Sequence, residues 1–157
     1  MTFIRQLFGN YMLVCAICGW LSAQIIKSVM AFASKEKLTL TQILFSNGGM
    51  PSSHSAAVMA LWTAALIQEG VGSAVFAVTT LFAIIVMNDA VGVRYETGEQ
   101  AKLLNRITKK IFSSEHEKFN TVLKEMIGHT PLQVFMGALL GIGVGIGLGF
   151  AMQVLPL

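Results

Sequence analysis

Two histidines stand where a membrane helix is expected to begin, and each has a proline nearby. His54 follows Pro51, Ser52 and Ser53, and His129 stands two residues before another proline. The first turn of a helix tolerates proline, and its remaining N–H groups and dipole attract anions such as phosphate. Histidine can protonate a leaving oxygen or attack phosphorus itself. With Ser52 and Ser53 as further donors to phosphate, these two places in the sequence indicate phosphoryl chemistry.

Charged residues beside the apolar segments extend this set. Asp89 and Arg94 follow the third apolar segment, Lys27 lies near the end of the first, and Gly49 precedes the first proline. An arginine fork suits phosphate, a carboxylate can orient a histidine, and glycine lets the backbone approach a bulky anion. Ionisable residues in or beside membrane spans are costly, which favours a functional role. The structural alternatives are ordinary helix caps, a boundary ion pair and a snorkelling lysine.

The elements that must position these residues are membrane helices. Hydrophobic residues make up 54% of the 157 residues and charged residues only 12%, about half the charged fraction of an average soluble domain. The sequence therefore predicts an all-α, integral membrane helical bundle in a single domain, 1–157. A helix needs about 20 apolar residues to cross a bilayer, which gives about four transmembrane helices. We expect the spans at about 10–33, 52–70, 71–93 and 131–154.

The basic residues set the expected orientation. If the connection between the third and fourth spans is cytoplasmic, every lysine and arginine except Arg5 lies inside or at the inner boundary. Both termini then face outwards, and the residues named above converge at the cytoplasmic face. A short-looped chain of this kind fits a bacterial inner membrane. No nucleic-acid partner is expected, because the sequence offers no platform of aromatic and basic residues.

The connection 97–128 is expected to hold cytoplasmic amphipathic helices. Leu104, Ile107 and Ile111 recur at helical spacing, and Ser114 with Glu117 forms a capping-box signature for a second helix. We expect these helices to lie against the membrane surface or to cover the site.

Glycines spaced by four residues form a stripe along the fourth span. Such stripes let helix backbones approach one another closely. The close approach can occur within the chain, or it can form a homodimer through Gly137, Gly141 and Gly145.

Three blocks in this order resemble the divergent branch of the type 2 phosphatidic acid phosphatase superfamily, which is related to acid phosphatases and vanadium-dependent haloperoxidases. They are GGMPSSHS at 48–55, NDAVGVR at 88–94 and GHTPLQVFMG at 128–137. The resemblance implies hydrolysis of lipid phosphate monoesters without a metal or other cofactor. It makes His54 the general acid, His129 the nucleophile, and Ser52 and Ser53 contacts of the phosphate.

The chain departs from the wider superfamily pattern. Gln133 stands where an aspartate orients the nucleophilic histidine, and Leu123 stands where an arginine binds phosphate. The wider superfamily also has about six spans. We hypothesise that Asp89 replaces the orienting carboxylate and Arg94 the missing arginine, with Gln133 beside the phosphate.

The sequence thus predicts a phosphatase-like membrane protein that hydrolyses a lipid or isoprenoid phosphate monoester at the cytoplasmic interface through a phosphohistidine. One alternative is a non-catalytic binder of phosphorylated lipid. Another is a metal-dependent lipid phosphotransferase that uses Asp89 and Glu96, since Mg²⁺ needs only one or two carboxylates besides substrate phosphates. A structural membrane component assembled through the glycine stripe is the third.

Overall fold

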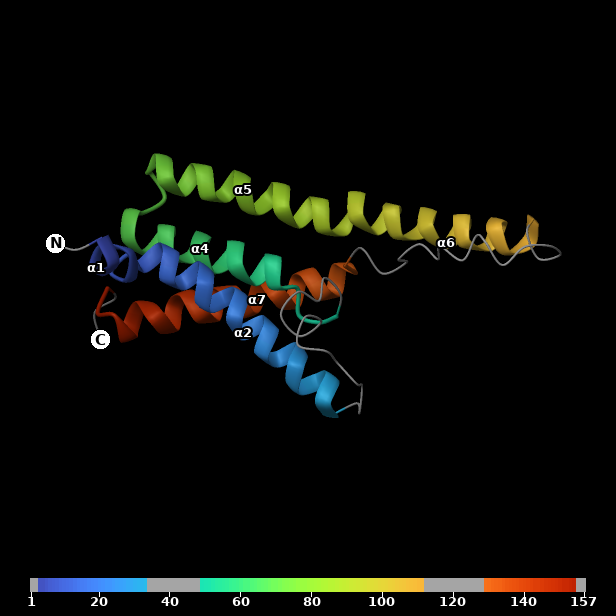
Figure 1. The fold of residues 1–157 in the computed structure, drawn as a ribbon. Helices are drawn as coiled ribbons and strands as arrows, with labels where there is room; N and C mark the ends of the chain where they lie inside the picture. Colours follow the sequence, from blue (N-terminus) through green and yellow to red (C-terminus); the bar gives the residue numbers. More distant parts are fainter. Residues whose placement is uncertain (1–2, 34–48, 112–128, 155–157) are drawn as a thin grey trace.

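The structure is a computed structural model that describes residues 3–33, 49–111 and 129–154. These residues fold into helices, so the prediction of an all-α membrane helical bundle is confirmed (Figure 1). The second amphipathic helix expected in the connection lies outside the described residues. The helices are α1 (Phe3–Phe8), α2 (Tyr11–Ala33), α4 (Ser53–Glu69), α5 (Ala74–Val91), α6 (Val93–Ile111) and α7 (Pro131–Ala151).

Helix α4 is the centre of the bundle and packs against α2, α5 and α7. Its sequence is rich in small residues, and Ala56, Ala60 and Ala64 have no exposed surface. Small side chains let the neighbouring backbones come close, which is how helices associate in lipid. With 17 residues, α4 is about 26 Å long at 1.5 Å per residue.

Helix α7 presents its glycine stripe to α4. A Cβ atom added at Gly141 would collide with the carbonyl oxygen of Ala56, and one at Gly145 would come within 2.7 Å of Thr63 Cβ. The close approach within the chain, one of the two alternatives for this stripe, is therefore present in the fold. A homodimer through Gly137, Gly141 and Gly145 stays a prediction, and it would have to form beside this intramolecular contact.

Three helical stretches in the described part of the chain are long and apolar enough to cross a membrane: Tyr11–Ala33, Ala74–Thr108 and Pro131–Ala151. About four spans were expected. The fourth expected span corresponds to α4, which is shorter than these three stretches and packs against all of them. The outer helices expose large apolar side chains, as helices do when lipid is their solvent. On α2 and α5 these include Ile25, Val29, Phe32, Val78, Leu81 and Ile85.

Helix α6 continues beyond the bundle in nearly the direction of α5, after a break at Gly92 (Figure 1). It makes its helix contacts with α5. The expected amphipathic helix is present, with Leu104 and Ile107 exposed, but it runs away from the end of the bundle and does not lie across it. The near-continuous path follows from the absence of a proline between the two helices.

The two ends of the bundle carry different contacts. The N- and C-termini lie at one end (Figure 1), where Tyr11 Oη donates a 2.7 Å hydrogen bond to the carbonyl oxygen of Gly145. Along α4, Trp62 Nε1 donates to Thr80 Oγ1 at 2.9 Å, which ties α5 to the centre. The beginnings of α4 and α7 and the end of α5 lie at the opposite end, so the helix entries with the two histidines meet there.

Candidate functional site

Backbone hydrogen bonds hold three segments together at this end of the bundle. The N–H of His129 donates to the carbonyl oxygen of Ala90 at the end of α5, at 3.1 Å. The N–H of Ser52 donates to the carbonyl oxygen of Gln133 in the first turn of α7, at 2.9 Å. Segments far apart in the sequence are thereby fixed at one depth, as the sequence pattern requires.

The entry to α4 differs in one detail from the expectation. Pro51 lies outside the helix, and Ser52 is its N-cap, so proline is not in the first turn. Ser52 Oγ accepts hydrogen bonds from Ser55 N at 3.3 Å and from Ser55 Oγ at 3.0 Å. Gly49 has φ +83°, a left-handed conformation that favours glycine. Ser52 therefore acts as the cap of α4, and its contact with phosphate stays a prediction.

Lys27 brings a positive charge from α2 to the beginning of α4. Its Nζ donates a 3.1 Å hydrogen bond to Ser53 Oγ. The lysine is only 8% exposed and Ser53 only 2%. An ammonium group buried at a helix N-terminus adds to the positive potential of that turn. A positive potential favours the binding of an anion.

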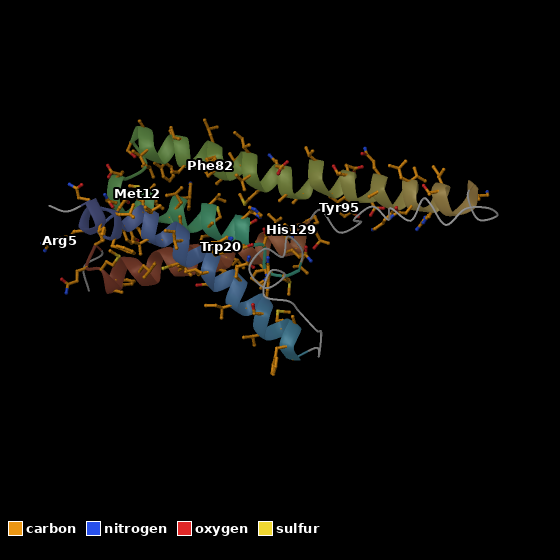
Figure 2. The ribbon with its side chains drawn as sticks, viewed as in Figure 1. Arg5, Met12, Trp20, Phe82, Tyr95 and His129 are labelled. Carbon is orange, nitrogen blue, oxygen red and sulfur yellow. The ribbon has the colours of Figure 1, made fainter. Side chains whose placement is uncertain are left out.

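The two histidines come from different segments: His54 belongs to the first turn of α4, and His129 lies just before α7. Their ring centroids are 6.5 Å apart and their planes are inclined by 56°. His129 is 2% exposed and His54 is half-buried. Figure 2 shows His129 at the end of the bundle, between the beginning of α7 and the end of α5. The two imidazoles are thus neighbours at the beginning of α4, and imidazole can act as a nucleophile or as a general acid.

Gln133 occupies the place next to the His129 ring. Its Oε1 lies 3.2 Å from His129 Nδ1 and accepts a 3.0 Å hydrogen bond from Thr130 N. Gln133 N in turn donates to Thr130 Oγ1 at 3.4 Å, which completes a capping box at the start of α7. The structure thus places the side chain of Gln133 beside Nδ1, and the orienting role hypothesised for Asp89 stays a prediction.

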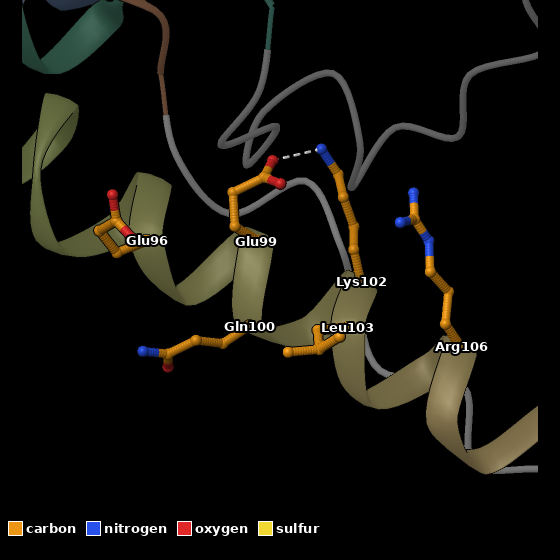
Figure 3. A pocket seen from close by; sticks show the side chains of 6 residues that line it. All are labelled: Glu96, Glu99, Gln100, Lys102, Leu103 and Arg106. Carbon is orange, nitrogen blue, oxygen red and sulfur yellow. Dashed lines mark hydrogen bonds and ion pairs between the residues drawn. The ribbon is translucent and has the colours of Figure 1, made fainter.

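The remaining candidate residues lie at the end of α5 and on α6. Asp89 is half-buried beside Ala90, whose carbonyl oxygen holds the His129 backbone. Arg94 belongs to the first turn of α6. Glu96, from the metal-dependent alternative, is exposed and lines a separate pocket of about 380 Å³ on α6 (Figure 3). Its lining residues are Glu96, Glu99, Gln100, Lys102, Leu103 and Arg106.

This pocket has the character of a solvated surface. Lys102 and Glu99 form an ion pair across it with an N–O distance of 2.6 Å (Figure 3). Both side chains are almost half exposed, and exposed pairs of this kind contribute little to stability. Over residues 3–33, 49–111 and 129–154, no group of three or more His, Cys, Asp or Glu side chains is placed to hold a metal ion.

Comparison with known proteins places this geometry in a family. Residues 8–144 match the Divergent PAP2 family. The chain belongs to the Divergent PAP2 family. It is also 41% identical over 147 residues to the uncharacterized membrane protein YuiD of Bacillus subtilis, an alignment that covers 87% of this chain and 92% of that protein. No solved structure matches the chain.

Two residues that contact members of the candidate site were not singled out from the sequence. Ser55 is fully buried and hydrogen bonds to Ser52, and Thr130 caps α7 and donates its N–H to Gln133. The signal for Thr130 was available, because Thr130 and Gln133 have the spacing of a capping box. Ser55 follows Ser52 by three, which places both on one face of α4.

Proposed function

We propose that this membrane protein hydrolyses a lipid or isoprenoid phosphate monoester through a phosphohistidine intermediate. The observation that carries the proposal is the pair of imidazoles 6.5 Å apart at a helix N-terminus that also holds a buried lysine. Family membership supports a phosphatase-like protein, and the membrane helices favour a substrate that is itself embedded in lipid.

In the proposed reaction, the phosphate binds between the first turn of α4 and Lys27. His129 attacks phosphorus, the N–P bond forms, and the P–O bond to the lipid alcohol breaks. His54 gives its proton to the departing alkoxide. Water then attacks phosphorus and loses a proton to His54, the N–P bond breaks, and inorganic phosphate leaves with His129 restored.

Lys27 and the helix dipole stabilise the charge that collects on the phosphoryl oxygens during both steps. Fixed donors aimed at developing charge are worth more in a site that excludes water than in solution. Arg94 is proposed to approach the same phosphate from the beginning of α6, and Asp89 to support His129 from the end of α5.

The proposed location is the cytoplasmic side of a bacterial inner membrane. The end of the bundle with the histidines is the end from which α6 extends, and α6 carries Lys102, Arg106 and Lys110. Positively charged residues near spans favour the cytoplasmic side.

A second candidate function is binding of a phosphorylated lipid without turnover. The neutral amide of Gln133 beside His129 favours it, because an amide cannot stabilise an imidazolium by charge as a carboxylate does. The anion-binding features, Lys27, Ser53 and the first turn of α4, serve either function equally.

The test is phosphate release from a panel of lipid and isoprenoid monophosphates by purified protein in detergent, with and without EDTA. Release that survives the chelator and falls at least a hundredfold in His129→Ala is the expected result. The matched control is His116→Ala, which removes a histidine that lies outside the described residues.

Other outcomes separate the candidates. Release that EDTA abolishes would point to the metal-dependent phosphotransferase. A folded protein that binds one of the lipid phosphates but releases phosphate from none of them would contradict the proposed hydrolysis. That result would support binding without turnover.

A further inference from the structure

The side-chain oxygen of Gln133, Oε1, lies within hydrogen-bond distance of two nitrogens, Thr130 N and His129 Nδ1. Thr130 N–H donates to Oε1 at 3.0 Å, and a backbone N–H is never an acceptor. This contact fixes which end of the amide points toward the cap, a choice that otherwise depends on the surrounding hydrogen bonds. The atom facing His129 is therefore a carbonyl oxygen with a second lone pair to offer.

An oxygen at this place determines the state of the imidazole. Oε1 lies 3.2 Å from His129 Nδ1 and can only accept, so a hydrogen bond requires Nδ1 to carry the proton. Nδ1 protonation leaves the lone pair of the neutral ring on Nε2. The general rule is that the partner of one imidazole nitrogen determines what the other nitrogen does.

The backbone of Gln133 adds a second connection. Its carbonyl oxygen accepts the 2.9 Å hydrogen bond from Ser52 N, the N-cap residue of α4. One residue thus contacts the ring of His129 and holds the turn where the phosphate is proposed to bind. Its own side chain has little freedom, because it is the N3 member of a capping box.

We propose that Gln133 is the positioning residue of His129: it holds the ring as the Nδ1–H tautomer with Nε2 directed at the phosphate turn of α4, and it does so without a charge. The proposal rests on the proposed function for the role of His129 as a nucleophile. It gives Gln133 an orienting role instead of the expected contact with the phosphate, and Asp89 keeps its proposed supporting role at the end of α5.

Because the amide of Gln133 carries no charge, replacing it with a carboxylate should change the pH at which His129 becomes a nucleophile. A carboxylate at this distance would favour the imidazolium and raise the pKa of His129, whereas an amide adds no charge beside the ring. Among the residues that the structure describes, Lys27 from α2, His54 from α4 and Asp89 from α5 are further titratable groups at this end of the bundle. They are the same in every variant used below, so they form a constant background.

Gln133→Glu separates positioning from capping. Glutamate serves as well as glutamine at the N3 position of a capping box, so a residue that only caps α7 would tolerate the change without effect on His129. If Gln133 positions the ring, the new carboxylate raises the pKa of His129 by about one to three units. Thr130→Val is the matched control, since it removes the cap hydroxyl and leaves Gln133 Oε1 with its donors.

The measurement is ¹⁵N NMR of histidine-labelled protein in detergent, with His129 assigned by its absence in His129→Ala. The expected wild-type spectrum shows the Nδ1–H tautomer at neutral pH. Gln133→Glu is expected to move the titration of His129 upwards, and Thr130→Val to leave it in place. A wild-type Nε2–H tautomer, or an unchanged titration in Gln133→Glu, would overturn the proposal.

This readout does not need turnover, so it distinguishes the two proposals. If the protein releases phosphate, the acidic limb of its rate profile should move to higher pH in Gln133→Glu by the same amount as the titration. If it releases none while the tautomer and the shift are as expected, the positioning role stands and the hydrolytic function fails.

Discussion

Lys27 is a buried lysine inside the helical bundle. It lies in an apolar helix, is 8% exposed, and donates to the neutral hydroxyl of Ser53. Taking an ammonium group out of water is costly unless charge or hydrogen bonds compensate. A phosphate that arrives at the first turn of α4 supplies the opposite charge at the place where the lysine already points. This burial beside the beginning of α4 is the reason for proposing Lys27 as a contact of the phosphate.

Lys27→Met is expected to weaken phosphate binding while leaving the fold intact. Methionine has a similar length and suits an apolar helix, but it donates no hydrogen bond. A charge-assisted hydrogen bond contributes about 1.5–3 kcal/mol, which corresponds to a roughly tenfold to hundredfold loss of affinity. The measurement is the dissociation constant for orthovanadate, a phosphate analogue, from thermal shifts in detergent.

Lys102→Met provides the matched control for that change. Lys102 lies on α6, pairs with Glu99 and is largely solvated, so its loss should leave vanadate binding unchanged. Equal affinity in the wild type and Lys27→Met would show that the lysine has a structural role and does not contact the anion.

Residue types and spacing indicated the helix entries with His54 and His129. They did not indicate which side chain in each entry caps the helix and which contacts another helix. Ser52 and Ser53 look equivalent in the sequence. The structure makes Ser52 the cap and gives Ser53 to Lys27, because only the N-cap position places a hydroxyl within reach of the N–H three residues later. Contacts between helices, such as that of Lys27, depend on packing that local spacing does not encode.

The contact of α4 with α7 is the element on which the site depends. A backbone that approaches this closely fixes the height of Ser52 against Gln133, and so the geometry of both helix entries. The spacing of four residues predicted the buried stripe. It did not indicate its partner, because Gly143 and Gly147 repeat the same spacing on the other side of α7 and face open space.

Gly141→Ala tests this contact against Gly143→Ala on the same helix. A methyl group at position 141 collides with the Ala56 carbonyl oxygen and comes within 3.0 Å of Met59 Cβ, so α4 and α7 must separate. Overpacking of this kind costs about 1–3 kcal/mol. We expect Gly141→Ala to lower the melting temperature in detergent and to reduce vanadate binding with it.

Position 143 has no atom within 4 Å of an added Cβ. Gly143→Ala should therefore be neutral, or stabilising by up to about 1 kcal/mol, because alanine is the better helix former. Melting temperatures that fall equally in the two variants would mean that helix propensity, and not the fit against α4, governs the effect.

For the whole molecule, the alternation of helix directions brings Lys27, His54, Asp89 and His129 to one end of the bundle. Helices α2 and α5 run toward that end, α4 and α7 begin at it, and the two termini lie at the other (Figure 1). The sequence predicted this arrangement because consecutive membrane spans run in opposite directions. Once the spans are known, the end of the bundle at which each helix begins is therefore fixed. It did not predict the continuation of α5 into α6, which depends on the local backbone at Gly92.

The orientation of the whole molecule can be measured with single cysteines in a background that lacks Cys15 and Cys18. Gly72 lies in the turn between α4 and α5 with open space around it, and Gln100 is exposed on α6. A membrane-impermeant maleimide should label Gly72→Cys in intact spheroplasts, and Gln100→Cys only after permeabilisation, because the basic residues of α6 favour the cytoplasm. The reverse pattern would move the site to the outer face without changing the fold. It would then require a substrate phosphate in the outer leaflet, since the end of the bundle that carries α6 also carries His54 and His129.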